Sequence, residues 1–204
     1  MTELRTDVSV LYVDPRGPYP KLVADWWDEK RDARNYAGPN PVVAHPPCGP
    51  WGRLKHLYKG SEHDCAPIAQ HQVRSYGGVL EHPAQSQLWA ACGLPLPGET
   101  DSLGGYTIAV DQVEWGHCAR KTTWIYLCGV PREAIASAPF PGRAPTHWVS
   151  GFRSSDKRRT YPEHYKKSGC AVPEGIKVCS AQQRRRTPIA FAEWLLELAA
   201  HARR

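Results

Sequence analysis

Short apolar runs, rich in β-branched and aromatic residues, recur along the chain between loops that contain glycine and proline. They occupy residues 8–13, 42–44, 79–80, 106–110 and 123–127. Short runs bounded by turn-forming residues predict strands, and runs that are apolar at consecutive positions are typical of strands buried on both faces. The pattern therefore predicts an α/β domain with a mostly parallel sheet.

A second pattern, with helical spacing, follows the second strand run. Pro67 suits the first turn of a helix that continues to about Tyr76, with Ile68 and Val73 facing inward, and two consecutive glycines end it. A short helix is also predicted over residues 21–27, within a segment that is otherwise mostly loop up to the second strand.

The clearest helix signal lies at the end of the chain. Thr187 is the expected N-cap and Pro188 the expected first helical residue. Apolar side chains then follow at i, i+3, i+4 and i+7, namely Phe191, Trp194, Leu195 and Leu198. We expect this helix to pack on the sheet.

With 204 residues, the chain has the length of a single domain that can bury a sizeable core. We therefore expect one domain over residues 1–204, with an α/β core at 1–128 and the C-terminal helix at 187–204. Residues 129–186 show little periodicity, which predicts a small, irregular, basic region between them.

Charge is distributed unevenly. Residues 1–142 carry 13 Lys and Arg against 15 Asp and Glu, whereas residues 143–204 carry 13 against 5. A basic region on a near-neutral body is typical of contact with a nucleic-acid backbone, although a solvated surface would look similar. The candidates for phosphate contact are Arg153, Lys157, Arg158 and Arg159, and the interleaved aromatic residues are Trp148, Phe152, Tyr161 and Tyr165.

The cysteines favour a reducing compartment. There are seven, with irregular spacing and no CxxC pair, which fits reduced thiols and disfavours a zinc ribbon. The spacing of His56, His63, Cys65 and His71 matches no common metal site, so no metal is expected. Without a signal-peptide or membrane-spanning pattern, the chain is expected in the cytoplasm as a monomer.

Two strands lead directly into polar residues and proline. The run at 42–44 continues as His-Pro-Pro-Cys, and the run at 79–80 continues as Glu-His-Pro. Because proline cannot extend a central strand, Cys48 is predicted on a stiff loop at the carboxyl edge of the sheet, where open α/β sheets bind ligands. In a parallel sheet, Glu81 would leave on the same side.

These segments, in this order, resemble the DNA (cytosine-5) methyltransferase family. The likeness rests on Pro-Pro-Cys at a strand exit, Leu-Glu-His-Pro at residues 80–83, and the segment 116–124 leading into a strand, and it covers about residues 41–130. Short phage-encoded members are the most similar, which would place the chain in the cytoplasm of a bacterial host. The resemblance implies a Rossmann-like, methyltransferase-type sheet and double-stranded DNA as the partner.

The resemblance also implies a mechanism. Cys48 would add to carbon 6 of a flipped cytosine, Glu81 would act as an acid at ring nitrogen 3, and Arg120 with Lys121 would hold the base and backbone. Burial is expected to raise the pKa of Glu81, and nearby cations are expected to favour the Cys48 thiolate.

S-adenosylmethionine is the implied cofactor, but the part of the chain that would bind it is short. Only 28 residues separate Val13 from Val42, and the first strand is followed by Asp-Pro-Arg-Gly-Pro instead of the family's Phe-x-Gly-x-Gly turn. Asp14 or Asp28 could receive the ribose or could cap turns, and Pro46 would border the same site.

Two alternatives remain open from the sequence. One is a non-catalytic DNA-binding relative that retains the fold. The other is a pyrimidine-modifying enzyme that uses the same cysteine and glutamate without S-adenosylmethionine.

Overall fold

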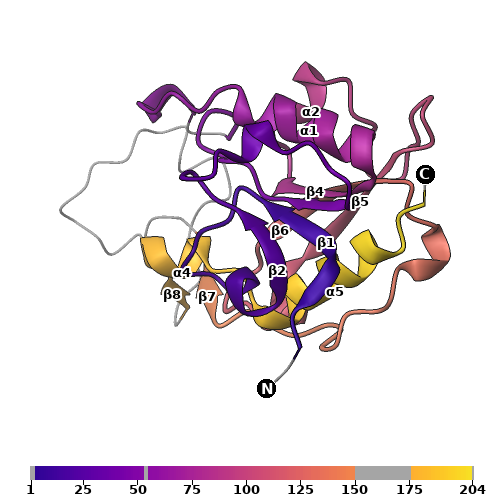
Figure 1. The fold of residues 1–204 in the computed structure, drawn as a ribbon. Helices are drawn as coiled ribbons and strands as arrows, with labels where there is room; N and C mark the ends of the chain where they lie inside the picture. Colours follow the sequence, from indigo (N-terminus) through magenta and orange to yellow (C-terminus); the bar gives the residue numbers. More distant parts are fainter. Residues whose placement is uncertain (1–2, 53–54, 150–175, 204) are drawn as a thin grey trace.

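A six-stranded sheet forms the centre of the protein (Figure 1). The computed structural model describes residues 3–52, 55–149 and 176–203. The order of the strands across the sheet is β2-β1-β3-β4-β6-β5. Their bounds are β1 (Arg5–Leu11), β2 (Val23–Trp27), β3 (Val42–Ala44), β4 (Gly78–Pro83), β5 (Tyr106–Asp111) and β6 (Thr122–Cys128).

The first four strands are parallel, which confirms the expected α/β architecture with a mostly parallel sheet. β6 runs antiparallel to both β4 and β5. The carboxyl ends of β1, β2, β3 and β4 therefore meet at one edge, where β6 begins. The order 2-1-3-4 is that of a doubly wound sheet, compatible with a Rossmann-like fold, and its switch point lies between β1 and β3.

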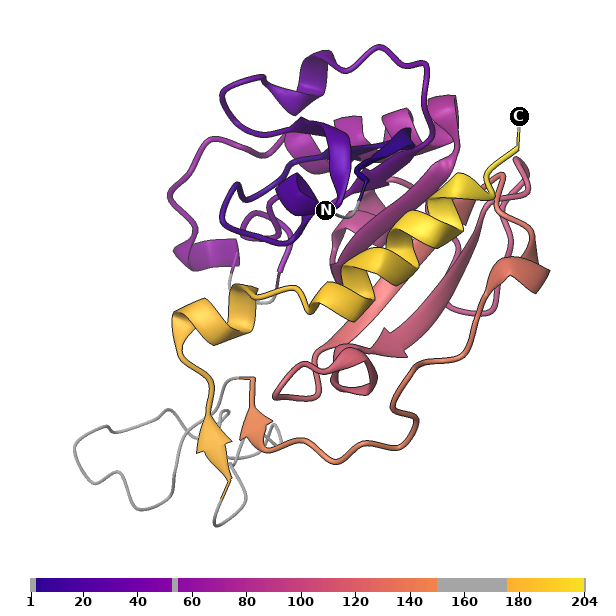
Figure 2. The ribbon, with the colours of Figure 1, turned by 60° about the horizontal axis from the view of Figure 1, so that its bottom comes forward.

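Helices cover the two faces of the sheet (Figure 2). α1 (Cys65–Tyr76) contacts β3, β4 and β6, whereas α5 (Ile189–Ala200) contacts β1, β3 and β4. Alternation within β3 explains how one strand serves both layers: Val42 and Ala44 join the core under α1, and Val43 joins the core under α5. The short helix α2 (Leu88–Ala91) adds Leu88 to the α1 side.

The C-terminal helix is confirmed, including its buried face. Phe191, Leu195 and Leu198 are completely buried, and Trp194 is 8% exposed. Trp194 also packs against the Trp115 ring, with centroids 4.7 Å apart. The predicted N-cap is wrong by one position, because Pro188 adopts an extended conformation (ψ 145°) and is itself the N-cap.

The predicted helix over residues 21–27 is also wrong. A single 3-10 turn, η1 (Tyr19–Lys21), is followed by β2, which pairs with β1 as a parallel edge strand. Side chains explain the preference for a strand: Val23 is fully buried, and the Asp25 carboxylate accepts a hydrogen bond from Ser9 on β1 (2.6 Å). The short segment between β1 and β3 thus supplies one additional strand.

The remaining described elements are small. They are η2 (Ala33–Asn35), η3 (Lys55–Leu57), η4 (Gln112–Trp115), η5 (Arg132–Ala134), β7 (His147–Trp148), β8 (Lys177–Val178) and α4 (Ala181–Arg185). β7 and β8 form a separate parallel pair. Within the described ranges, no helix combines the length and apolar character needed to cross a membrane.

Candidate active site at the carboxyl edge of the sheet

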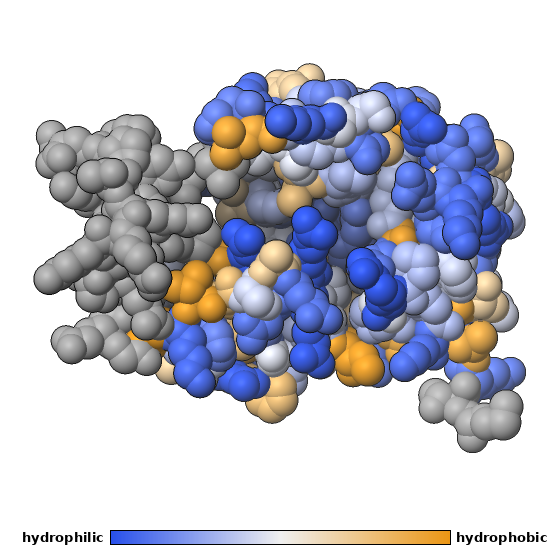
Figure 3. Space-filling model, turned by 90° about the vertical axis from the view of Figure 1, so that its left-hand side faces the viewer, coloured by the Kyte–Doolittle hydropathy of each residue, from blue (hydrophilic) through white to orange (hydrophobic). Residues whose placement is uncertain are grey.

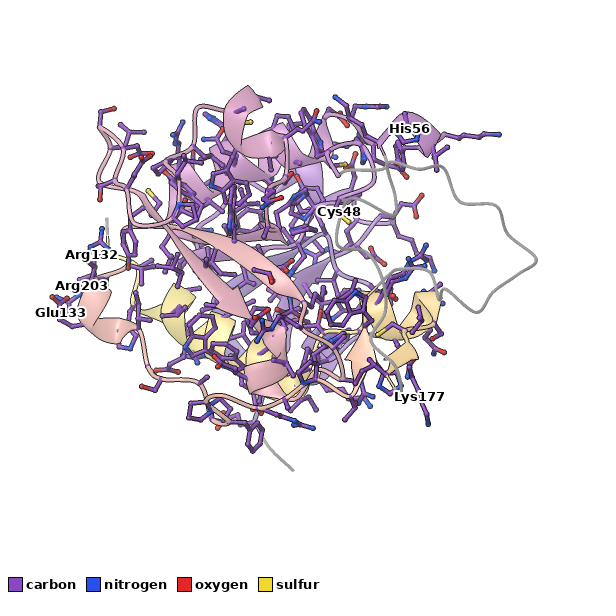
Figure 4. The ribbon with its side chains drawn as sticks, turned by 180° about the vertical axis from the view of Figure 1, so that it is seen from behind. Cys48, His56, Arg132, Glu133, Lys177 and Arg203 are labelled. Carbon is purple, nitrogen blue, oxygen red and sulfur yellow. The ribbon has the colours of Figure 1, made fainter. Side chains whose placement is uncertain are left out.

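Cys48 and Glu81 leave the sheet on neighbouring strands. Ala44 at the end of β3 pairs with Leu80 in β4, so the loop that carries Cys48 starts beside the strand end that carries Glu81. The Cys48 side chain is exposed, whereas Glu81 is only 9% exposed. Figure 4 shows Cys48 far from Arg132 and Arg203, which lie at the opposite end of the molecule.

The side of the molecule on which Cys48 lies is mostly hydrophilic. Figure 3 views this side and shows polar residues surrounding a central recess, with scattered apolar patches. The carboxyl ends of parallel strands are a common location for a ligand site in this class of fold.

Both Glu81 carboxylate oxygens have protein partners. His45 Nδ1 lies 3.0 Å from Glu81 Oε2, and Gln112 Nε2 donates to Glu81 Oε1 at 3.0 Å. On its other side, His45 Nε2 lies 2.5 Å from the Tyr19 hydroxyl. We call these four side chains, Tyr19, His45, Glu81 and Gln112, the Glu81 network.

The Glu81 network changes the expected charge of the carboxyl group. Burial raises the pKa of Glu81, but the hydrogen bond from His45 and the positive charge of Lys121 outweigh that effect and bring the pKa to about 2. The expectation that burial keeps Glu81 protonated is therefore wrong. At neutral pH this site contains a carboxylate.

The protonation state of the Cys48 thiol also differs from the one expected. Desolvation by the surrounding protein raises its pKa, and the negative charge of Glu81 raises it further. Lys121 and Arg185 act in the opposite direction without reversing the shift. The expectation of a stabilised thiolate is therefore wrong, and Cys48 needs a base before it can act as a nucleophile.

His82 is a buried, neutral side chain next to the site. Its ring is completely inaccessible and lies against Trp89, with centroids 6.4 Å apart. Burial lowers the pKa of His82 to about 4, although the negative charge of Glu81 and, to a smaller extent, the backbone of Pro47 oppose this shift. Neither ring nitrogen has a hydrogen-bond partner among the described residues.

The loop before β6 brings a lysine to the site. Arg120 is 66% exposed and pairs with Asp111, with Nε and Oδ2 3.2 Å apart. Lys121 is half-buried, and its charge acts on both Glu81 and Cys48. Of the two cations predicted from the sequence, Lys121 is thus the one whose charge acts on Cys48 and Glu81.

The predicted cofactor residues lie at the same edge but are engaged in local turns. Asp14, after β1, accepts from the backbone of Arg16 (3.0 Å) and forms an ion pair with its guanidinium (3.0 Å). Asp28, after β2, is 6% exposed and accepts from the backbone of Arg31 at 3.0 Å. Pro46 is buried within the Cys48 loop. The turn-capping role considered for the two aspartates is therefore present.

The predicted phosphate contacts, Arg153, Lys157, Arg158 and Arg159, lie outside the described residues. The strands that bracket them are attached to the loop before β6. The backbone N–H groups of Thr146 and His147 both donate to the Cys118 carbonyl at 2.9 Å. The Sγ atoms of Cys118 and Cys179 lie 3.7 Å apart.

Two functional candidates were missed in the sequence. His45 was passed over although it precedes the Cys48 loop, because nothing in the sequence shows its contact with Glu81. Arg185 belongs to α4, whose capping box joins Ser180 and Gln183; the Ser-x-x-Gln pattern could have indicated this helix. The position of α4 is fixed by a hydrogen bond between His117 Nε2 and the Gln183 carbonyl (2.9 Å).

Within the described residues, no group of three or more His, Cys, Asp or Glu side chains is arranged to hold a metal ion. Comparisons with models of protein families, with curated proteins and with solved structures find no match to this chain. The function is therefore inferred from the geometry and chemistry of the site.

Proposed function

We propose that this chain is a DNA (cytosine-5) methyltransferase-like enzyme that uses Cys48 as its nucleophile. One observation carries the proposal: the loop with the exposed Cys48 thiol leaves β3 beside β4, the strand that carries the Glu81 carboxylate, and the charge of Lys121 acts on both groups. These are the three loops that the family resemblance singles out. This edge combines a nucleophile, a group that can transfer a proton and a cation. Such a combination supports nucleophilic acyl transfer or conjugate addition.

Cytosine is the substrate that makes best use of these groups. Addition of sulfur to carbon 6 places negative charge on the ring unless ring nitrogen 3 gains a proton, and the addition makes carbon 5 nucleophilic. A base within a duplex must first leave the stack, so the target nucleotide would be flipped toward the recess. Lys121 would balance the charge around Glu81 and the base.

S-adenosylmethionine would supply the methyl group for carbon 5. Asp28 is the better-suited residue to hold its ribose, because Asp14 already uses both carboxylate oxygens on Arg16. Asp28 follows β2 at the edge where we propose that the cofactor binds, but it is largely buried and already caps a turn. These features support weak binding of the methyl donor.

Double-stranded DNA is the proposed partner. The excess of Lys and Arg after residue 143 supplies charges for the phosphate backbone, and Arg185 brings part of that charge to the Cys48 edge. We propose that Arg153, Lys157, Arg158 and Arg159 contact phosphates, with Trp148 near the bases.

The test is direct detection of modified DNA. The purified chain is incubated with a cytosine-containing duplex and S-adenosylmethionine, and the nucleosides are analysed by mass spectrometry. We expect 5-methylcytosine with the wild type and with Cys92→Ser, a matched cysteine control away from the site, but not with Cys48→Ala. Equal product from Cys48→Ala and wild type would exclude the proposed nucleophile.

A second function is favoured by Asp14 and Asp28, because both carboxylates are already engaged in capping turns and are less free to hold a cofactor. The same thiol and carboxylate could act on a pyrimidine without a methyl donor, and reversible addition would then exchange the carbon-5 hydrogen with solvent. Tritium release from 5-tritiated cytosine in DNA, with no S-adenosylmethionine present, would identify this activity. DNA binding with neither exchange nor methylation would indicate a non-catalytic relative.

A further inference from the structure

Three consecutive arginines lie at the end of the short helix α4. Arg184 and Arg185 form its last turn, Arg186 is its C-cap, and all three residues are exposed. None of them forms an ion pair with a carboxylate within the part of the chain that the structure describes. Adjacent positive charges repel one another, and an anion bound among them lowers that repulsion. We call these three residues the α4 arginine cluster.

Most other arginines in the described ranges have a partner inside the protein. A carboxylate oxygen lies within 3.2 Å of each of Arg5, Arg16, Arg31, Arg34, Arg74 and Arg120. Arg132 and Arg143 lie over the rings of Tyr106 and Phe140 instead. The α4 arginine cluster therefore concentrates positive charge that the fold leaves available to a ligand.

Several hydrogen bonds hold α4 in place although it is short. In its capping box, the Gln183 N–H donates to Ser180 Oγ at 3.1 Å, and the Ser180 N–H donates to the Gln183 side chain at 2.9 Å. His117 Nε2 donates to the Gln183 carbonyl at 2.9 Å, and His117 Nδ1 accepts from the Ala119 N–H at 3.0 Å. The cluster is thus attached to the loop before β6, which also carries Lys121.

The cluster lies on the side of the molecule that carries the candidate active site. Figure 4 shows Cys48 and Lys177, which precedes α4, on the side away from Arg132. The charge of Arg185 acts on Cys48 and on Asp14, which follow β3 and β1 respectively. These two strands form the switch point of the sheet, where open α/β sheets bind their ligands.

A recess borders the cluster where α4 meets α5. It has a volume of about 340 Å³, and the residues that line it include Arg186, His117, Cys118, Pro188 and Ile189. Both ring nitrogens of His117 are engaged within the protein, whereas Arg186 has no carboxylate partner among the described residues. Ile189 is 58% exposed. A guanidinium beside apolar side chains fits a phosphate together with its sugar.

We propose that the α4 arginine cluster binds the phosphodiester backbone of double-stranded DNA, with Arg186 and the recess beside it holding one phosphate and its sugar. This inference rests on the proposed function and specifies the surface that holds the DNA partner at the Cys48 edge. Arginine suits the role because its planar guanidinium can form two parallel hydrogen bonds to phosphate oxygens. Such contacts carry no sequence information, so they determine where the duplex lies and not which base is chosen.

The salt dependence of DNA binding tests the cluster. Fluorescence anisotropy with a short labelled duplex gives the affinity at a series of salt concentrations. Arg185→Gln with Arg186→Gln removes up to two phosphate contacts, so the slope of log K against log salt should fall in magnitude by about 2. Lysine at the same two positions keeps the charges and should restore most of the slope. Glutamine and lysine are both good helix formers, so α4 should persist in either variant.

The control matched in charge is Arg132→Gln with Arg203→Gln. Both residues are exposed and lie at the end of the molecule opposite to Cys48 (Figure 4). This variant loses the same number of positive charges, so its net charge equals that of the α4 variant. Its salt slope should equal that of the wild type, because the lost charges lie away from the proposed DNA surface. Circular dichroism of each variant checks that the fold is retained.

Crosslinking reports where the duplex lies, which a loss of affinity alone does not. The photoreactive residue p-benzoylphenylalanine is placed at Gln182, an exposed position in α4, or at Glu133, an exposed position at the opposite end (Figure 4). Irradiation with the duplex should crosslink the protein that carries the probe at Gln182 and not the one that carries it at Glu133. Neither position is a proposed contact, so affinity should stay near that of the wild type.

The outcomes separate this inference from the proposed chemistry. The assigned surface is overturned by an unchanged salt slope in the folded α4 variant, by the absence of a crosslink from Gln182, or by a wild type that does not bind the duplex. If the slope falls and the crosslink forms but the wild type gives neither carbon-5 exchange nor methylation, the surface stands and the proposed function fails. If 5-methylcytosine forms while the slope is unchanged, the proposed function stands and this inference fails.

Discussion

His45 Nδ1 lies 3.0 Å from Glu81 Oε2 and joins the loop of an exposed thiol to a buried carboxylate on the next strand. This contact connects residues from two parallel strands at the edge where such sheets bind ligands. It also explains why a buried glutamate can remain charged.

Cys48→Ala should remove chemistry without affecting the fold. The side chain is exposed and contributes little to the core, so the free energy of unfolding should change by less than about 0.5 kcal/mol. Affinity for a cytosine-containing duplex should also stay near that of the wild type. Urea unfolding and fluorescence anisotropy measure these two quantities, and a large loss in either would show that Cys48 has a structural role.

Acid should destabilise the protein in two steps. The pKa of His82 is about 4 in the fold against 6.5 ordinarily, so the unfolded state binds more protons between these values and stability falls as the pH drops through them. The loss can reach about 3 kcal/mol. Glu81, with a pKa of about 2 instead of 4.5, adds a further loss as the pH falls below 4.5.

Urea unfolding from pH 7 down to pH 4 would measure the His82 contribution. His82→Leu should flatten the dependence over this range, whereas His71→Gln, which alters an exposed histidine on α1, should leave it unchanged. Identical slopes for His82→Leu and wild type would show that His82 is not the group responsible.

S-adenosylmethionine should bind weakly, with a Kd of tens of micromolar or higher, equivalent to about 6 kcal/mol of binding free energy. The physical reason is that both candidate carboxylates already cap turns. Isothermal titration calorimetry of the protein alone and with duplex DNA tests this, and Asp28→Ala should weaken binding more than Asp14→Ala. Nanomolar binding would contradict the argument.

Arg158 and Arg159 should contribute salt-dependent affinity for DNA. Replacing both by Gln removes up to two phosphate contacts, which should lower the magnitude of the slope of log K against log salt by about 2. The control matched in charge is Lys55→Gln with Lys59→Gln, which removes two positive charges at exposed positions. If the slope of the arginine variant equals that of the wild type, Arg158 and Arg159 do not contact phosphates.

Much of the fold could be predicted because continuous apolar runs and helix spacing are local properties. β3, β4, β5, β6, α1 and α5 all follow from them. β2 was missed because its polar Asp25 and two tryptophans look unlike a buried strand, and its stability depends on pairing with β1. Short elements such as α4 depend similarly on contacts with distant segments.

The positions of the chemical groups could be predicted, but their protonation states could not. Burial of Glu81 is implied by its place at the end of an apolar strand, and burial alone favours the neutral acid. Two groups lower the pKa of Glu81 again, the hydrogen-bond donor His45 and the cation Lys121. Both come from parts of the sequence remote from Glu81. The sign of the pKa shift is therefore a tertiary property.

The parallel pairing of His147 in β7 with Lys177 in β8 places the two ends of the intervening segment beside each other. Hydrogen bonds from Thr146 and His147 to Cys118 attach this base to the α/β core. His147 and Lys177 therefore form a junction that the α/β core itself holds in place. A chain of different length between these two residues would start and end at the same two points, so the sheet and the Cys48 edge would keep their contacts. This junction is thus a place where the sequence can change, in evolution or by engineering, without a change in the core.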